Sequence, residues 1–139
     1  MRLRSSRAGQ GTVEFLVALP LLLLLLFGVL GVARLVSASL GVNAVAREAA
    51  RAGSVAASAS QAASSARSRG LQVGGEYGLA NGSLAVQPDV SNWGARGELS
   101  VTATYTVHLA DVAFFQLGNL TLQRTDAEVI GPWRTLASP

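Results

Sequence analysis

The feature that most constrains this chain is a run of nineteen residues without a charged side chain, from Phe15 to Ala33. As an α-helix with a rise of about 1.5 Å per residue, the run would be roughly 28 Å long, close to the ~30 Å hydrocarbon core of a bilayer. Helices of soluble proteins are seldom apolar on every side over such a length. The sequence therefore predicts a membrane-inserted helix.

Arginines on the two sides of this run indicate its orientation. All eleven basic residues of the chain are arginines, and Arg2, Arg4 and Arg7 precede the run. Positive charges are retained preferentially on the cytoplasmic side of a membrane. Arg34 and later arginines reduce the asymmetry, but the short N-terminal tail still favours a cytoplasmic N-terminus. We therefore expect a single-pass protein of the cytoplasmic membrane whose C-terminal part lies outside the cytoplasm.

A cleaved secretory signal is a competing interpretation of the same run. The small residues Val36, Ser37 and Ala38 follow it, as they do before a signal-peptidase site. The apolar run, however, is longer than the usual stretch of about 7–15 residues in such signals. It also continues without a break into another segment with helical character. A cleaved signal is therefore the less favoured alternative.

The composition excludes several other classes of protein. Half of the residues are hydrophobic and only 14% are charged, against about 25% charged residues in an ordinary soluble domain. This balance argues against a simple soluble protein and against intrinsic disorder, which requires low hydrophobicity and high charge. The chain has no cysteine, which excludes a disulfide scaffold, a thiolate metal site and a cysteine nucleophile.

Glu14 does not fit a plain membrane anchor. It stands directly before Phe15, within an apolar stretch that begins near Gly11. A carboxylate inside a membrane helix costs roughly 3 kcal/mol at the centre of the bilayer and less near the interface. Either Glu14 marks the headgroup level and reaches towards Arg7, or it is a functional charge with a specific partner.

The sequence around Glu14 resembles a known export signal. The octapeptide AGQGTVEF, residues 8–15, leads into an apolar helix with an early proline, Pro20. It is similar to the class III signals of type IV pilin-like proteins. In that class a prepilin peptidase cuts after a glycine on the cytoplasmic face, and a glutamate stands at position five of the mature chain. The resemblance implies that Glu14, Phe15 and Pro20 take part in assembly.

The same resemblance selects the bond that is cut. A cut after Gly9 makes Gln10 the first residue of the mature chain and Glu14 the fifth. A cut after Gly11 would make Glu14 the third residue, which does not fit the class. Gly9 and Gln10 are therefore the expected cleavage site.

Within that class the chain most resembles the TadE-like family, the minor pseudopilins of tight-adherence (Flp-type) pili. The alanine- and arginine-rich segment 42–52 and the two alternating segments 101–109 and 120–130 support this. The resemblance implies a structural or initiating subunit without catalysis. The implied partners are other pilin and pseudopilin subunits, the pilus assembly machinery, the prepilin peptidase and the lipid bilayer, with no nucleic acid and no small-molecule substrate.

The segment after the membrane run predicts a helix. Residues 35–69 are rich in alanine and serine and contain no proline, which favours helix formation. We expect this helix to continue from the membrane, with room for a bend near Gly41, and to end by Gly70. Glu48 and Arg51, three residues apart on one helix, support it weakly.

The C-terminal half predicts a small antiparallel sheet, so the expected fold class is α+β. Asn81-Gly82 is a hairpin signal. Residues 98–109 alternate between apolar and polar residues, and 120–130 form a second, less regular strand. One face of the first strand is expected to carry Leu99, Val101, Ala103, Tyr105, Val107 and Leu109. The predicted divisions are a leader (1–9), an assembly helix (10–36), a helical extension (37–69) and a β domain (70–139).

Residues for catalysis or cofactor binding are sparse. The single histidine, His108, lies on the polar face of the first predicted strand, where a surface role is expected. A lone histidine without cysteine cannot form a typical zinc site. Asp126 and Glu128 share a strand face and are interpreted as solvated charges rather than as cation ligands. The sequence contains no phosphate-binding glycine motif and no nucleophile elbow. We therefore expect no enzyme, no cofactor and no metal.

Phe114 and Phe115 form the one apolar pair in a predicted loop. They either cap the small core or form an exposed contact with another pilin subunit or with the membrane surface. For the whole chain, the favoured hypothesis is a minor pseudopilin of a tight-adherence pilus. The alternative is a signal-anchored envelope protein with an extracytoplasmic binding domain.

Overall fold

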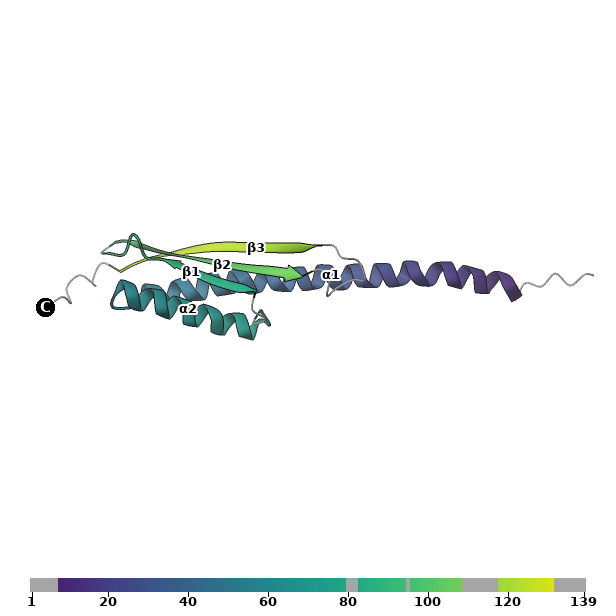
Figure 1. Cartoon of the computed structure of the whole chain (residues 1–139), viewed down its shortest axis with the longest axis horizontal. Coiled ribbons are helices and arrows are strands. Elements are labelled where there is room, and N and C mark those ends of the chain that lie inside the picture. Colours follow the sequence, from purple (N-terminus) through teal and green to yellow (C-terminus); the bar gives the residue numbers. More distant parts are fainter. Residues whose placement is uncertain (1–7, 80–82, 95, 109–117, 132–139) are drawn as a thin grey trace, which may run out of the picture.

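The computed structural model describes residues 8–79, 83–94, 96–108 and 118–131, which form two helices and three strands (Figure 1). Helix α1 spans Ala8–Ser54 and helix α2 spans Ala59–Glu76. The strands are β1 (Leu84–Asp89), β2 (Glu98–His108) and β3 (Asn119–Val129). The expected α+β fold class, a long N-terminal apolar helix followed by a small antiparallel sheet, is confirmed.

Helix α1 is one uninterrupted helix of 47 residues, which corresponds to a length of about 70 Å. The bend expected near Gly41 does not interrupt it. A side chain at Gly41 would come within 2.9 Å of Leu79 and 3.0 Å of Tyr77. The glycine therefore allows the close approach of the chain that follows α2.

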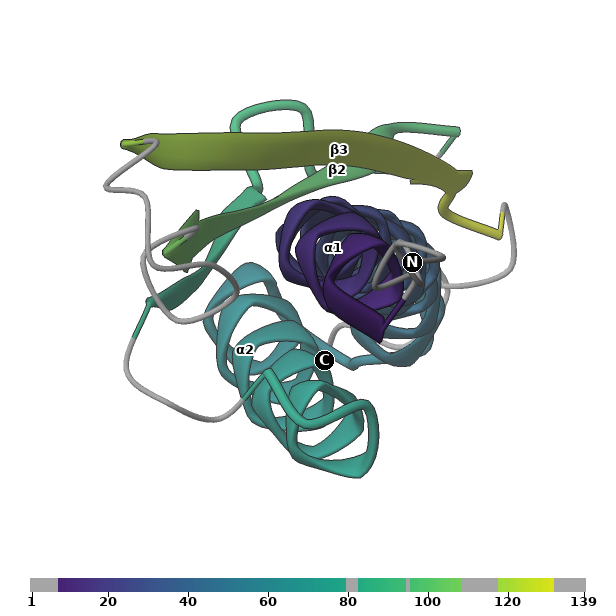
Figure 2. The ribbon, with the colours of Figure 1, turned by 90° about the vertical axis from the view of Figure 1, so that its right-hand side faces the viewer.

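The helix expected over residues 35–69 is in fact divided between two helices. α1 ends at Ser54, and α2 begins after Ser58, whose Oγ accepts a hydrogen bond from the Gln61 amide at 3.3 Å. Such an N-cap satisfies one of the amide groups that have no partner inside the helix. The chain then reverses, and α2 packs alongside the C-terminal half of α1 (Figures 1 and 2).

The predicted end of this helical segment at Gly70 is also wrong, because α2 continues to Glu76. Gly70 is buried inside the helix, where an added methyl group would lie 2.9 Å from a Val86 methyl and 3.3 Å from Ala49. The helix ends instead before Gly78, whose φ of +72° suits a residue without a side chain. Packing, rather than helix termination, accounts for the glycine at position 70.

The sheet has the strand order β1-β2-β3, with both pairs antiparallel. The alternation predicted for residues 98–109 is confirmed in β2: its alternate residues are buried, namely Leu99, Val101, Ala103, Tyr105 and Val107. The expected member Leu109 lies outside the described residues. The second predicted strand, 120–130, corresponds to β3, whereas β1 was not predicted. Asn81-Gly82 also lies outside the described residues, but the flanking elements are a helix and a strand, so the hairpin prediction is wrong.

The two helices cover one face of the sheet (Figure 2). The core combines small and medium-sized apolar residues from both layers, and its largest fully buried side chains are Leu99, Ile130, Val42, Val45 and Val101. The opposite face of the sheet is polar, and a hydrogen bond joins the Thr102 and Thr125 hydroxyls at 2.9 Å. Leu35 is the first α1 residue packed against this core.

One ion pair joins the helices at the surface. Arg69 of α2 lies 3.6 Å from Glu48 of α1, and both side chains are partly exposed. Glu48 therefore has a partner on the neighbouring helix. Exposed pairs of this kind contribute less than about 1 kcal/mol, so apolar packing accounts for most of the contact between α1 and α2.

Substituting two glycines of α2 separates helix propensity from packing. Gly70→Ala and Gly75→Ala each replace glycine by alanine, whose helix propensity is more favourable by about 1 kcal/mol. A methyl group at Gly75 meets nothing within 4 Å, whereas one at Gly70 collides with Val86. We expect Gly75→Ala to be neutral or stabilising, and Gly70→Ala to be less stable than Gly75→Ala by about 1–3 kcal/mol, as for other overpacked cores. Urea unfolding of the full chain in detergent measures both; equal stabilities would contradict the packing assigned to Gly70.

Candidate functional site

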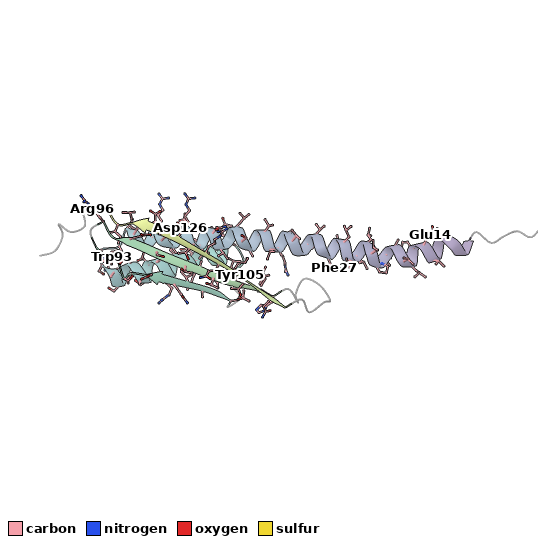
Figure 3. The ribbon with its side chains drawn as sticks, turned by 90° about the horizontal axis from the view of Figure 1, so that it is seen from above. Glu14, Phe27, Trp93, Arg96, Tyr105 and Asp126 are labelled. Carbon is pink, nitrogen blue, oxygen red and sulfur yellow. The ribbon has the colours of Figure 1, made fainter. Side chains whose placement is uncertain are left out.

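The candidate site is the N-terminal part of α1, which projects beyond the sheet and α2 (Figures 1 and 3). Among the described side chains between residues 11 and 33, none is buried. The exposed apolar side chains occur on every side of the helix, as Leu21, Leu22, Leu24 and Leu25 show. Such a surface is unfavourable in water, so this part of α1 requires lipid or protein around it.

The length and hydropathy of α1 fit a membrane anchor. Among the described helices, α1 is the one that is long and apolar enough to cross a bilayer, with a mean hydropathy of 2.9 in its most apolar window. No part of that window is buried against the rest of the chain. This distinguishes it from the core helix of a soluble protein, which would be mostly covered.

Glu14 lies at the start of this exposed section, near the N-terminal end of the helix (Figure 3). It is exposed and borders a shallow apolar hollow lined by Val13, Val17, Ala18 and Leu21. Along the described part of α1, the next charged residue is Arg34. It is twenty residues from Glu14, or about 30 Å along the helix axis. Within the described chain, the helix therefore offers Glu14 no nearby arginine. Arg7 lies outside the described residues.

Gln10 and Glu14 are four residues apart within α1, whose first residue is Ala8. Residues with this spacing lie on the same face of a helix, one turn apart. An amino group formed at Gln10 would therefore be within about 6 Å of Glu14 along the helix axis. The bond between Gly9 and Gln10 lies in the first turn, where helices lack internal acceptors and fray most readily.

Phe15 and Pro20 are the other two residues expected to act in assembly. Phe15 is 63% exposed beside Glu14, and Pro20 is exposed inside the helix. Proline has no amide hydrogen, so the carbonyl group of Leu16 loses the hydrogen bond that the amide of residue 20 would normally donate. All three predicted assembly residues thus lie within about two turns of one helix, free of contact with the sheet.

The other residues considered in the sequence lie elsewhere. His108 is exposed on β2, as predicted, with Nδ1 3.0 Å from Asn119 Oδ1. Asp126 and Glu128 share one face of β3 and are the cross-strand partners of Val101 and Leu99 on β2. In the part of the chain that the structure describes, no three histidine, aspartate or glutamate side chains come together as a metal site would require. Phe114 and Phe115 lie outside the described residues.

The exposed apolar surface of α1 extends further than the uncharged run predicts. Val36 and Leu40 lie beyond the uncharged run, yet both are exposed. Their spacing of four residues places them on one face of the helix, and Ala38, between them, is buried on another. The apolar residues after Arg34 are visible in the sequence. Which of them are buried and which are exposed depends on where the sheet packs.

The arrangement defines a class of protein: a small α+β body carried on a helix that fits a membrane anchor. Residues 9–51 match the model of a family described as TadE-like protein. This match confirms the resemblance predicted from the sequence, and it covers the projecting part of α1 and most of its packed part. No curated protein matches the chain. No solved structure matches it either.

Two pairs of arginine substitutions test whether the projecting section is the membrane anchor. Leu22 and Leu26 lie inside the uncharged run, and Val36 and Leu40 have the same spacing beyond it. Leu22 and Leu40 are almost equally exposed, at 64% and 60%. An arginine at the centre of a membrane helix costs about 2.5–3.5 kcal/mol, so Leu22→Arg/Leu26→Arg loses roughly 6 kcal/mol of insertion free energy.

We expect Leu22→Arg/Leu26→Arg to leave the membrane fraction on alkaline extraction, and Val36→Arg/Leu40→Arg to stay in it. The physical reason is that the second pair reaches the headgroup region, where a guanidinium group remains hydrated. Retention of both variants, or loss of both, would contradict the assignment of the anchor to the uncharged run.

Proposed function

We propose that this chain is a minor pseudopilin that takes part in assembling a tight-adherence pilus. The similarity of residues 9–51 to TadE-like proteins indicates a part in such a pilus. The observation that carries the finer proposal is the projecting section of α1, which is apolar on all sides and has no cover within the described chain. A helix of this kind can lie first in lipid and later among the helices of neighbouring subunits.

In this proposal the chain is inserted with its N-terminus in the cytoplasm and its body outside. Residues 1–9 are a leader that a prepilin peptidase removes, and 10–36 form the assembly helix. The body acts through its surface as a structural or initiating subunit and performs no catalysis. Its partners are the other pilin and pseudopilin subunits and the assembly machinery.

Processing should depend on Gly9 and not on Gly11. A protease pocket that accepts a small residue before the cut excludes a leucine side chain. We expect Gly9→Leu to accumulate at the full-length mass in membranes that contain the peptidase, while Gly11→Leu, the matched control, is shortened. Intact mass measurement of the purified membrane protein gives both results.

The mature N-terminus also decides between the proposed function and its alternatives. A wild-type chain that begins at Gln10 supports the pseudopilin. A chain that still begins at Met1 favours a signal-anchored envelope protein with an extracytoplasmic binding domain. A chain that begins near Ser39 indicates a cleaved secretory signal. If Gly9→Leu were shortened like wild type, the assigned cleavage site would be wrong.

Glu14 is proposed to bind an N-terminal amino group in the assembly. Cleavage after Gly9 creates an amine with an ordinary pKa near 8, largely protonated at neutral pH. A carboxylate in a low-dielectric environment is costly unless it is paired. Pairing with the amine of a neighbouring subunit would fix one axial register between the two helices. If Gln10 cyclises after cleavage, that amine is lost and Glu14 needs a different donor.

Two substitutions of Glu14 separate assembly from processing. Glu14→Ala and Glu14→Gln both remove the charge, and Glu14→Gln keeps the size of the side chain. We expect both variants to be inserted and cleaved like wild type. The amount of each that is recovered with pilus components should be several-fold lower. Pulldown from detergent extracts measures recovery, and intact mass measures cleavage in the same samples. Normal recovery of both variants would leave Glu14 as a marker of the membrane interface.

A further inference from the structure

The position of the sheet along α1 determines how far the body stands from the membrane. Strands β2 and β3 extend further towards the N-terminus of α1 than α2 does (Figure 1). The end of the sheet that points this way carries the cross-strand pairs Val107–Leu120 and His108–Asn119. We call these four residues the base of the sheet.

The level of the base on α1 follows from two distances. A side chain at Gly53 would contact Leu99, so the opposite end of β2 lies beside Gly53. From Leu99 to Val107 the strand advances about 26 Å, at ~3.3 Å per residue. The same distance along a helix is about 18 residues, which places the base roughly level with Leu35. This agrees with Leu35 being the first α1 residue packed against the core.

The base is therefore directly adjacent to the end of the apolar run. Ala33 is the last residue of that run, Arg34 follows it, and Leu35 already packs against the body. A separation of two residues corresponds to about 3 Å, which is less than the thickness of the headgroup region on one side of a bilayer. No stalk separates the described body from the anchor.

The chemistry of the base suits a headgroup layer. Leu120 is 39% exposed, and His108 and Asn119 are polar and exposed beside it. On α1, Val36 and Leu40 add exposed apolar side chains close to the same level. In the headgroup layer, apolar side chains can be buried at the acyl boundary while polar groups beside them remain hydrated.

We propose that the base of the sheet rests on the membrane, with Leu120 in the headgroup layer on the side where the C-terminal part of the chain emerges. This rests on the proposed function in one respect: the uncharged run must span the bilayer. The partner is the phospholipid surface itself. The contact would hold the body in one orientation before assembly, and extraction of the helix from the bilayer would break it.

Single tryptophans report the depth of three positions in the full chain. In a Trp93→Phe/Trp133→Phe background we place tryptophan at Leu120, Val129 or Leu22. Val129 is the matched control, because it is an exposed apolar residue (71%) of the same strand but lies about 30 Å further from the base. Leu22 is the control for insertion, because it lies in the middle of the uncharged run.

Each variant is reconstituted into phosphatidylcholine vesicles that contain a headgroup spin label or brominated acyl chains. We expect the headgroup label to quench Leu120→Trp at least about two-fold more than Val129→Trp, and brominated chains to quench Leu22→Trp. Labels on both leaflets make the result independent of orientation in the vesicle. Circular dichroism of each variant in the same vesicles verifies that the body is folded.

The outcomes separate this inference from the proposed function. Quenching of Leu22→Trp with equal, weak quenching of Leu120→Trp and Val129→Trp would support the anchor. It would overturn the inference that the base of the sheet rests on the membrane. Absence of quenching at Leu22→Trp would overturn the anchor itself, and with it the proposed function. Strong quenching of both Leu120→Trp and Val129→Trp would place the sheet flat on the membrane and would also overturn the inference.

Discussion

The structure depends on the close packing of the C-terminal half of α1 against both α2 and the sheet. This contact is built from small side chains: Val42, Val45, Ala46, Ala49 and Ala50 on α1 are almost completely buried. Because the residues are small, the backbones approach closely, and a glycine is needed wherever even a methyl group would collide with the next layer. Gly53 and Gly70 are such positions. This packing involves the C-terminal half of α1, whereas none of the described side chains between residues 11 and 33 is buried.

One continuous helix thus meets two different environments. Its C-terminal half has one buried face and one polar face, as expected for a helix at the surface of a small domain. In its N-terminal half, the exposed apolar side chains lie on every side, and none of the described side chains between residues 11 and 33 is buried. The two halves are continuous, although Pro20 removes one internal hydrogen bond of the N-terminal half. The proximity of the base of the sheet to Arg34 follows from the same continuity.

Glu14 is the exception within the apolar half. Its nearest charged residue along the described helix is far away, so any compensating charge must come from outside the described chain. In lipid near the interface, water and headgroups can supply it; among packed helices, only another subunit can. In the proposed assembly, the requirement for a partner would therefore be greater once the helix has left the membrane.

Several properties could be predicted from the sequence because they depend on local chemistry. The uncharged run, the alternation of β2 and the string around Gly9 and Glu14 are all contiguous, and the periods of helix and strand are short. The α+β class and the TadE-like resemblance follow from them. The return of α2 along α1, the strand β1 and the role of Gly70 could not be predicted in the same way. Glycine is compatible with a helix end, a turn or a close contact, and only the neighbours brought together by folding, here Val86 and Ala49, decide among these. The position of the base relative to Ala33 was likewise decided by tertiary packing, because it depends on which α1 residue meets the end of a strand more than seventy residues later in the chain.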